Sequence, residues 1–423
     1  MSRKFLGILL ILLGLSTIVY SFIRARLDFA PVSVSTIAFL LGTVSLGMGL
    51  SFCLSKNYWK GRDKLLKGTV FFVSCLICIV PLEVISREMV RCRTYKNCPN
   101  ASYSVDHVEY TFSVQLNSDG YRDGEFSRVP ESPIAIIGDS HTFGWGVEQD
   151  KTFSHLLEAK LGVEGKVLNL GVEGHDLLEY LMVLKTFLGK TEFFVLFITT
   201  GNDFFLEVPK AGPPRRSAFQ KMCALNLCEL LSKNMARISN NLDARGMQNP
   251  LRHLDIDTLK RNVTDPRLVD LALSWKLNPH LLKSAIERPN LNKWYEDTMA
   301  SFLHVPTNKE ALSKFVSILK HAKKRLIVFL IPPNFMVADS YVEAYAQLGF
   351  YAQQKGQLVC DPRLHGMITE FLVEQGVEVV DLQKYFCNDE NVDTYYYRWD
   401  GHLTPRGHEF IANVLFRKLG TQP

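Results

Sequence analysis

The sequence lacks the patterns that mark several common classes of protein. The six cysteines after residue 86 include no Cys-x-x-Cys pair, and none is closely grouped with histidine, which disfavours a structural metal site. It has no internal repeat, heptad pattern or low-complexity tract, so a solenoid, a coiled coil and a disordered chain are not indicated. No nucleic-acid-binding motif occurs, and the net charge is only +5. We therefore expect no metal, no cofactor and no nucleic acid.

Charge is absent from two long stretches near the N-terminus, residues 5–23 and 29–55. Each is long enough to cross a bilayer, which takes roughly 20 apolar residues. A third apolar stretch, 68–86, carries Glu83 near its end, where an acidic group costs less than at the middle of a bilayer. A cleaved signal peptide is the alternative for the first stretch, but its uncharged run is too long for one. We predict a membrane anchor over residues 1–90, with transmembrane helices at about 5–23, 31–54 and 68–86.

The number of spans decides on which side of the membrane the rest of the chain lies. Three spans with the N-terminus in the cytoplasm place the remainder outside, whereas two spans return it to the cytoplasm. Under the three-span topology, the lysines and arginines that flank the spans are divided almost evenly between the two sides. The distribution of positive charge therefore does not decide the orientation.

Cysteines provide a second argument about the compartment. The six that follow the predicted spans form three near pairs: Cys92 with Cys98, Cys223 with Cys228, and Cys360 with Cys387. Disulfides persist in oxidising compartments, and this pairing favours one, although six reduced cysteines are the alternative. We predict an integral cytoplasmic-membrane protein, in contact with the lipid bilayer, whose globular part is extracytoplasmic.

An apolar run at 134–137 ends in the turn Gly138-Asp139-Ser140. A buried parallel strand of this length places the following side chain at the carboxyl edge of a sheet, where α/β proteins bind ligands. Ser140 is a candidate nucleophile if a base and oxyanion donors lie nearby. Asp139 is interpreted as a structural carboxylate that fixes the turn, and His141 as a residue that lines the site.

A candidate base lies in the late sequence Asp400-Gly-His402. Asp400 is close enough in sequence to orient the imidazole, and Pro405 predicts the start of a helix just after it. His408, in that helix, is the competing base, but it lacks an acidic partner on its own side of the helix. Two further strand-to-turn junctions, 167–174 and 193–203, can each deliver an oxyanion donor.

These four segments, in this order, resemble the SGNH (GDSL-like) hydrolase superfamily. Its blocks are a Gly-Asp-Ser, a glycine after a second strand, a Gly-x-Asn-Asp and a late Asp/His pair. The resemblance implies that Ser140 is the nucleophile, His402 the base and Asp400 its orienting carboxylate. It also implies an oxyanion hole made by the backbone N–H groups of Ser140 and Gly174 and the side-chain amide of Asn202.

The chain departs from the family pattern at two positions. Thr200 stands where the third block usually has glycine, and the late pair is Asp-x-His rather than Asp-x-x-His. With a single intervening residue, Asp400 can instead make a structural contact, which would leave Ser140 and His402 as a dyad. Triad and dyad both remain open at this point.

Short apolar strands alternate with amphipathic helical patterns, which favours parallel β-α units. We predict an α/β domain over residues 91–423, with the three-layer α/β/α fold of the SGNH hydrolases, a parallel sheet and the transmembrane helices before it. A helical insertion at about 206–325 interrupts the alternation. Its aromatic residues either shape a substrate cleft or pack the insertion's own core: Trp275, Trp294 and Tyr295.

Three functions are compatible with these residues. The first is a membrane-anchored serine esterase that cleaves O-acyl esters through an acyl-serine intermediate, with acetyl on a carbohydrate implied by the resemblance. The second is an O-acyltransferase that uses the same residues to modify an exported polysaccharide. The third is a non-catalytic membrane interaction protein, against which the intact blocks argue. The expected partner is an acylated small molecule or carbohydrate.

Overall fold

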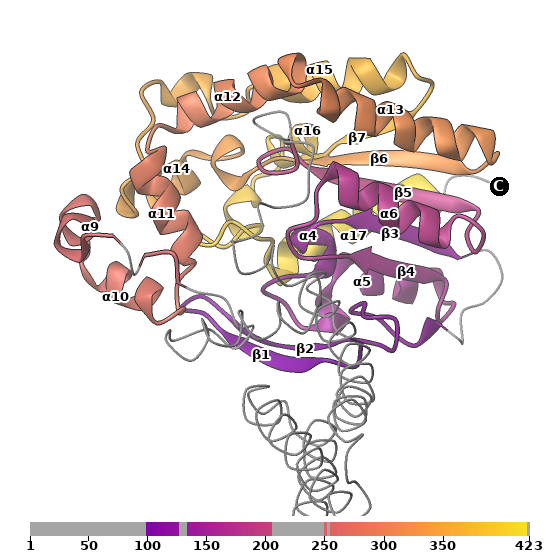
Figure 1. The fold of residues 1–423 in the computed structure, drawn as a ribbon, viewed down its shortest axis with the longest axis horizontal. Coiled ribbons are helices and arrows are strands. Elements are labelled where there is room, and N and C mark those ends of the chain that lie inside the picture. Colours follow the sequence, from indigo (N-terminus) through magenta and orange to yellow (C-terminus); the bar gives the residue numbers. More distant parts are fainter. Residues whose placement is uncertain (1–98, 127–132, 205–248, 252–253, 421–423) are drawn as a thin grey trace, which may run out of the picture. The chain divides into compact units, whose positions relative to one another are not determined.

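The structure is a computed structural model that describes residues 99–126, 133–204, 249–251 and 254–420 (Figure 1). The chain divides into two compact units, and the described residues all belong to the one that comprises Tyr95–Ala211 and Asp243–Pro423. Several predicted features lie outside the described residues: the spans at 5–23, 31–54 and 68–86, and the pairs Cys92–Cys98 and Cys223–Cys228. Within the described ranges, no helix is both long enough and apolar enough to cross a bilayer.

A parallel sheet of five strands forms the centre of this unit, in the order β4-β3-β5-β6-β7. The strands are β3 (Ile134–Gly138), β4 (Val167–Gly171), β5 (Phe193–Thr199), β6 (Arg325–Ile331) and β7 (Glu378–Asp381). Ile134 is paired with Val167 of β4 on one side and with Phe193 of β5 on the other. Because β3 is covered on both faces, it is buried along its whole length and reads as an uninterrupted apolar run.

Helices cover both faces of the sheet (Figure 1). One hydrophobic cluster joins Ala135 and Ile137 of β3 to helices α6 (Leu177–Phe187), α13 (Pro306–His321) and α15 (Arg363–Val373). A second cluster joins Ile134 and Ile136 to α5 (Phe153–Leu161) and α17 (Pro405–Gly420). Successive residues of a strand point to opposite faces, so β3 supplies both cores. The α/β class with a parallel sheet is therefore confirmed.

Several helices lie between β5 and β6 in sequence, in the described part of the region predicted as an insertion. They are α9 (Ile256–Asn262), α10 (Arg267–Leu273), α11 (Pro279–Glu287) and α12 (Leu291–His304), followed by α13. Trp294 packs against Phe335 and Phe350, with ring centroids 5.4 and 6.0 Å apart, and Tyr295 is buried in the same cluster. These two aromatic residues thus contribute to the hydrophobic core.

The remaining described elements are short. They are α4 (Ser140–Phe143), α14 (Asp339–Gln347), α16 (Leu382–Phe386), and the single 3₁₀ turns Gln149–Lys151, Asn334–Met336, Lys355–Gln357 and Val392–Thr394. Before the sheet, β1 (Ser102–Asp106) and β2 (Thr111–Gln115) form an antiparallel hairpin. Phe112 and Val114 of β2 are buried in a third cluster with Phe143 and Trp145, which follow Ser140 in the chain. The hairpin therefore packs against the segment that carries the candidate nucleophile.

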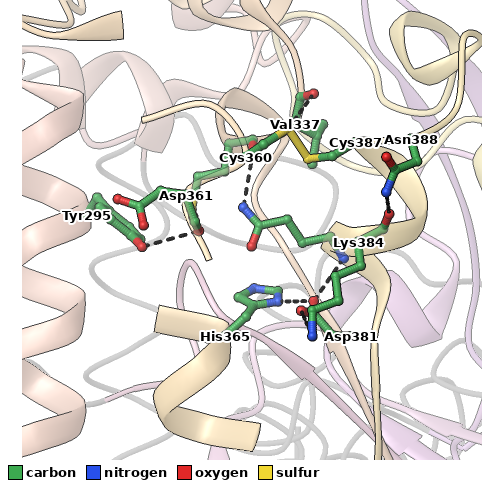
Figure 2. Close-up of a disulfide and its surroundings, with 11 residues drawn as sticks. Tyr295, Val337, Cys360, Asp361, His365, Asp381, Lys384, Cys387 and Asn388 are labelled. Carbon is green, nitrogen blue, oxygen red and sulfur yellow. Dashed lines mark hydrogen bonds and ion pairs between the residues drawn. A yellow bond between two sulfur atoms is a disulfide. The ribbon is translucent and has the colours of Figure 1, made fainter. Parts of the chain in front are cut away.

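Cys360 and Cys387 form a disulfide, as one of the three predicted pairs requires (Figure 2). The bond joins the segment after Lys355–Gln357 to the end of α16. Two buried polar residues lie beside it in Figure 2, His365 of α15 and Asp381 at the end of β7. The disulfide thus fastens together two segments that flank the edge strand of the sheet.

Candidate active site

Ser140 is the first residue of α4, and only Asp139 separates it from the end of β3. The Asp139 carboxylate caps this helix by accepting a hydrogen bond from the His141 N–H at 3.0 Å, as expected for a structural carboxylate at the turn. The end of β4 lies very close to α4, because a Cβ on Gly171 would come within 2.2 Å of the Phe143 nitrogen. Glycine at that position allows the short helix to sit directly over the sheet edge and present Ser140.

His402 and Asp400 lie in the loop that precedes α17. The His402 carbonyl accepts a hydrogen bond from the Tyr397 N–H at 2.8 Å, which closes the loop into a tight turn. Gly401, between the two candidate residues, has φ = +82°, a left-handed conformation that glycine adopts without strain. This turn brings the side chains of its two neighbours onto the same side.

The structure brings Ser140, His402 and Asp400 into one hydrogen-bonded chain. His402 Nε2 lies 2.8 Å from Ser140 Oγ, and His402 Nδ1 lies 2.6 Å from Asp400 Oδ2. Ser140 is 7% exposed, and the His402 side chain retains 17% exposure. The single-residue spacing does not prevent Asp400 from reaching the imidazole, so the contacts are those of a triad rather than a dyad.

The electrostatics of the pair favour a basic imidazole. Burial by itself lowers the pKa of His402, but the adjacent Asp400 carboxylate outweighs burial and raises it above 6.5. For Asp400, burial acts to raise the pKa, but the contact with His402 dominates and holds it well below its ordinary value. Asp400 is thus ionised, and His402 is the stronger base that this chemistry needs.

Two other histidines near the site have different environments. Burial lowers the pKa of His141 to about 4, although its ring lies only 5.0 Å from that of His402. His408 is fully buried, and its Nδ1 accepts a hydrogen bond from the Phe153 N–H at 3.1 Å. Burial also lowers the pKa of His408 well below its usual range. His408 therefore joins α17 to α5 and does not compete with His402 as a base.

The two predicted oxyanion donors follow the strands on either side of β3. Gly174 comes after β4, in a left-handed conformation with φ = +66°, and Asn202 comes after β5. Because parallel strands end at one edge, both residues flank the strand that carries Ser140. The Asn202 side-chain amide donates to Asp139 Oδ2 at 3.3 Å, which ties the Asn202 turn to the nucleophile turn.

Asp203 holds the turn that carries Asn202. Its Oδ2 accepts hydrogen bonds from the Thr199 N–H at 2.8 Å and the Tyr180 hydroxyl at 2.9 Å. Burial raises the pKa of Asp203 well above its ordinary value, with the nearby Asp139 acting in the same direction. The block Gly201-Asn202-Asp203 thus places one residue toward the sheet edge and anchors the next in the core.

Thr200 stands where the SGNH pattern usually has glycine, and its side chain makes structural contacts. Its buried hydroxyl donates to the Ile331 carbonyl at 3.1 Å and lies 2.9 Å from His365 Nε2. The other ring nitrogen of His365 is 2.5 Å from Asp381 Oδ1 (Figure 2). A glycine could not make these contacts, which connect the end of β5 to β6, α15 and β7.

Sequence reasoning missed further contacts to Asp400. The Tyr110 hydroxyl donates to Asp400 Oδ2 at 2.7 Å, and Asn278 Nδ2 lies 3.5 Å from Oδ1. Tyr110 comes from the turn between β1 and β2, and Asn278 is the N-cap residue of α11. No motif or spacing in the sequence relates either residue to Asp400, so only the fold reveals them.

The backbone of the Asp400 loop is also held by the hairpin. The Glu109 carboxylate accepts hydrogen bonds from the backbone N–H groups of Arg398, at 2.7 Å, and Trp399, at 3.0 Å. Burial raises the pKa of Glu109 to about 7, even though these two hydrogen bonds lower it. The turn between β1 and β2 therefore forms hydrogen bonds with both the backbone of this loop and the Asp400 side chain.

Arg122 connects the hairpin to the nucleophile segment. Its guanidinium is fully buried and donates to the carbonyl oxygens of Gly144 at 2.6 Å, Val147 at 2.7 Å and Ser113 at 2.7 Å. Such bonds from a charged donor are stronger than neutral ones. The segment that follows Ser140 is thereby fixed to β2.

Among the described residues, no group of three or more histidine, cysteine or acidic side chains is arranged to hold a metal ion.

Comparison with known proteins gives structural neighbours only. No family model and no curated protein matches the sequence. A putative lipolytic protein of the G-D-S-L family from Desulfitobacterium hafniense is 10% identical, with a TM-score of 0.33 over 68% of this chain and 99% of that one. A member of the same family from Veillonella parvula is 9% identical, with a TM-score of 0.33 over 69% and 100% of the two chains. The lipase/acylhydrolase from Enterococcus faecalis is 14% identical, with a TM-score of 0.32 over 68% and 95%.

At such low identities and TM-scores, the function has to be inferred from the chemistry of the chain's own residues.

Proposed function

We propose that this protein is a membrane-anchored serine esterase that cleaves O-acyl esters, with acetyl groups on a carbohydrate as the expected substrate. The observation that carries the proposal is the hydrogen-bonded chain from Ser140 Oγ through His402 to Asp400, at 2.8 and 2.6 Å. It stands at the carboxyl edge of a parallel sheet, the edge at which α/β proteins bind ligands. This arrangement of nucleophile, base and orienting carboxylate is the one that acyl transfer requires.

The reaction begins when His402 Nε2 takes the proton of the Ser140 hydroxyl as Oγ attacks the ester carbonyl carbon. The tetrahedral oxyanion is stabilised by the Ser140 and Gly174 N–H groups and the Asn202 amide, each worth roughly 2.7–4 kcal/mol in such sites. Collapse of the tetrahedral species breaks the ester C–O bond, and His402 protonates the departing alcohol. Water then attacks the acyl carbon with His402 again as base. The second tetrahedral species breaks its bond to Ser140 Oγ, His402 returns the proton to Oγ, and the carboxylic acid leaves.

Asp400 serves this cycle by holding His402 in one tautomer. Its Oδ2 accepts the Nδ1 proton, so Nε2 is left free to accept the proton of Ser140. The carboxylate also stabilises the imidazolium that forms at each proton transfer. The protonation states required are those that the environment favours, an ionised Asp400 and a basic His402.

We place the catalytic domain outside the cytoplasm. The Cys360–Cys387 disulfide supports this location, because disulfides persist in oxidising compartments and are rare in the cytosol. The predicted three-span anchor within residues 1–90 supports it as well, since an odd number of spans carries the rest of the chain across the membrane. A carbohydrate ester outside the cytoplasm is the substrate class that fits this placement.

The test uses the full chain in detergent, incubated with aryl acetate and longer aryl esters. We expect Ser140→Ala to abolish turnover without unfolding the protein, because the change removes one oxygen from a turn. A fluorophosphonate should form an adduct on Ser140, located by mass spectrometry. Ser317→Ala, a change to an exposed serine on α13, should behave as wild type. An adduct elsewhere, or turnover by Ser140→Ala, would remove the basis of the assignment.

A second arm of the same experiment separates hydrolysis from transfer. Acyl-serine passes either to water, which releases free acid, or to a sugar hydroxyl, which yields an acylated carbohydrate. We expect release of free acid to dominate when polysaccharide is added with the acyl donor. Net acylation of the polysaccharide would instead identify an O-acyltransferase. If the protein shows neither fluorophosphonate labelling nor turnover, the non-catalytic interaction protein is the remaining function.

A further inference from the structure

Tyr110 is a buried tyrosine whose hydroxyl has hydrogen-bond partners on both sides. It donates to Asp400 Oδ2 at 2.7 Å and accepts from the Trp145 indole Nε1–H at 2.8 Å. The same Oδ2 atom accepts the bond from His402 Nδ1 at 2.6 Å. One carboxylate oxygen therefore has two donors, the base of the proposed reaction and a phenol from a separate hairpin.

The contacts continue from Tyr110 back to the nucleophile. Trp145 lies just after α4, and its backbone N–H donates to the Ser140 carbonyl at 3.0 Å. The side chain of Trp145 then reaches Tyr110, which reaches Asp400, His402 and finally Ser140 Oγ. The five residues form a closed ring of hydrogen bonds that begins and ends at the nucleophile. A closed ring leaves the Asp400 carboxylate little freedom to rotate.

The Tyr110 ring itself is held by its neighbours. The His107 ring stacks on it with centroids 4.5 Å apart, and the Tyr397 ring lies 4.6 Å away. Arg122 fixes the carbonyl groups of Gly144 and Val147, which lie on either side of Trp145 in the chain. The Tyr110 ring is thus held by packing, and its hydroxyl is held by Trp145, whose neighbouring backbone the Arg122 guanidinium fixes.

We propose that Tyr110 is a positioning residue of the active site that acts through Asp400 on His402. The proposal rests on the proposed function and adds a residue to that same site. By donating to Oδ2, Tyr110 fixes the plane of the carboxylate, and Trp145 strengthens this donation by polarising the phenol. The hydrogen bond from Tyr110 also draws charge from Oδ2, which weakens the attraction between Asp400 and the imidazolium. It therefore limits how far Asp400 raises the pKa of His402.

The kinetic test compares wild type, Tyr110→Phe, Asp400→Asn and the double variant as full chains in detergent, on aryl acetate. We expect Tyr110→Phe to lower kcat about 10- to 100-fold at the pH plateau, the factor associated with one hydrogen bond to a charged group. KM should stay within about twofold, because Tyr110 does not touch substrate. In the Asp400→Asn background the same change should cost less than about threefold, since its target is gone.

A second readout does not depend on turnover. Diethyl pyrocarbonate acylates neutral imidazole, so the pH dependence of His402 labelling, followed by mass spectrometry, reports the pKa of His402. Tyr110→Phe leaves Asp400 a stronger acceptor, and we expect the labelling curve to move to higher pH. In the Asp400→Asn background the curve should not move. The other titratable groups near the pair are common to all variants: Asp139, Glu173, His141, His408, His107, Glu109, Tyr345 and Tyr397.

Two further variants serve as controls for the Tyr110→Phe measurements. Trp145→Phe keeps Tyr110 and removes the N–H donor to its hydroxyl together with part of the indole ring, and it should shift kcat and the labelling curve in the same direction as Tyr110→Phe. Tyr351→Phe makes the same chemical change on a tyrosine that is 48% exposed, and it should match wild type.

An equal loss of kcat in the presence and absence of the Asp400 carboxylate would overturn the positioning role, as would a labelling curve that Tyr110→Phe leaves in place. If wild type neither hydrolyses esters nor reacts with fluorophosphonate at Ser140, the proposed function fails. The labelling curves of His402 still decide whether Tyr110 acts on the pair.

Discussion

Gly401 explains how the side chains of Asp400 and His402 meet although only one residue separates them. Its φ of +82° folds the chain so that the side chains on either side converge. A Cβ at this position would also come within 2.8 Å of the Tyr345 hydroxyl. Both the backbone conformation and the available space therefore favour glycine. The shorter spacing is a different turn with the same contact between carboxylate and imidazole.

The pH dependence of kcat/KM should report His402. Asp400 raises the pKa of His402 against the opposing effect of burial, so the rising limb should have its midpoint above 6.5. Asp400→Asn removes the charge that stabilises the imidazolium, and we expect the midpoint to move to lower pH. The plateau should also fall by about 10²- to 10⁴-fold, because the amide no longer selects the productive tautomer.

His402→Ala is the comparison for this measurement and should lose more activity than Asp400→Asn, since it removes the group that moves the proton. Both variants are assayed from about pH 5 to 9 on the same aryl ester. If the profile of Asp400→Asn coincides with that of wild type, Ser140 and His402 act as a dyad and Asp400 is structural.

At the residue scale, the sequence predicts the groups that belong to local patterns. Ser140 follows an apolar strand, and His402 stands two residues after a carboxylate, so each is visible in a short window. Tyr110 and Asn278 belong to no such pattern, because their contacts with Asp400 arise from the packing of a hairpin and an N-cap against a distant loop. Tertiary contacts of this kind leave no periodicity in the chain.

The strands of the central sheet were predictable as elements because they are buried on both faces. The runs 134–137 and 326–331 are continuously apolar, and they form most of β3 and β6. The hairpin β1–β2 was not predicted, since only Phe112 and Val114 of β2 are buried and the alternation is short. Two half-exposed strands of five residues give too weak an alternation of apolar and polar residues to be predicted from the sequence. The turn of this hairpin nevertheless places Tyr110 at the site.

The Cys360–Cys387 disulfide offers a prediction about the edge of the sheet. The bridge closes a loop with a sequence separation of 27, and a loop of that size stabilises a fold by about 3–4 kcal/mol through the entropy of the unfolded chain. We expect the double change Cys360→Ser and Cys387→Ser to lower the midpoint of thermal unfolding by several degrees, with kcat within about twofold of wild type. Scanning fluorimetry measures the midpoint.

Reductant supplies the control for that prediction. It should lower the unfolding midpoint of wild type by more than that of the double variant, because the double variant lacks this bridge and keeps only the other two predicted pairs. Equal midpoints for the two proteins under oxidising conditions would show that the bridge does not stabilise the native fold. The buried pair of His365 and Asp381 next to the bridge remains intact in every variant (Figure 2).

The compartment is a property of the whole molecule, and its prediction combines the anchor with the disulfide. We expect a tag placed after Pro423 to be reached by protease from outside sealed cells. Cys360 and Cys387 should react with an alkylating reagent only after reduction. A tag that is accessible only from the cytoplasm, together with thiols that react without reduction, would mean that residues 68–86 do not cross the membrane. Both the extracytoplasmic location and the proposed substrate class, an exported carbohydrate, would then be wrong.

The ring of contacts around Asp400 joins parts of the chain that are made at very different times. His402 follows Ser140 by 262 residues, so at about 5–20 residues per second the ribosome needs roughly 13–52 s to travel from one to the other. During that interval the nascent chain carries a nucleophile without its base, and a product released before Asp400 stays in that state. Under the proposed function, the enzyme is therefore inactive throughout its own synthesis and becomes reactive only when the loop before α17 has been added and folded into place.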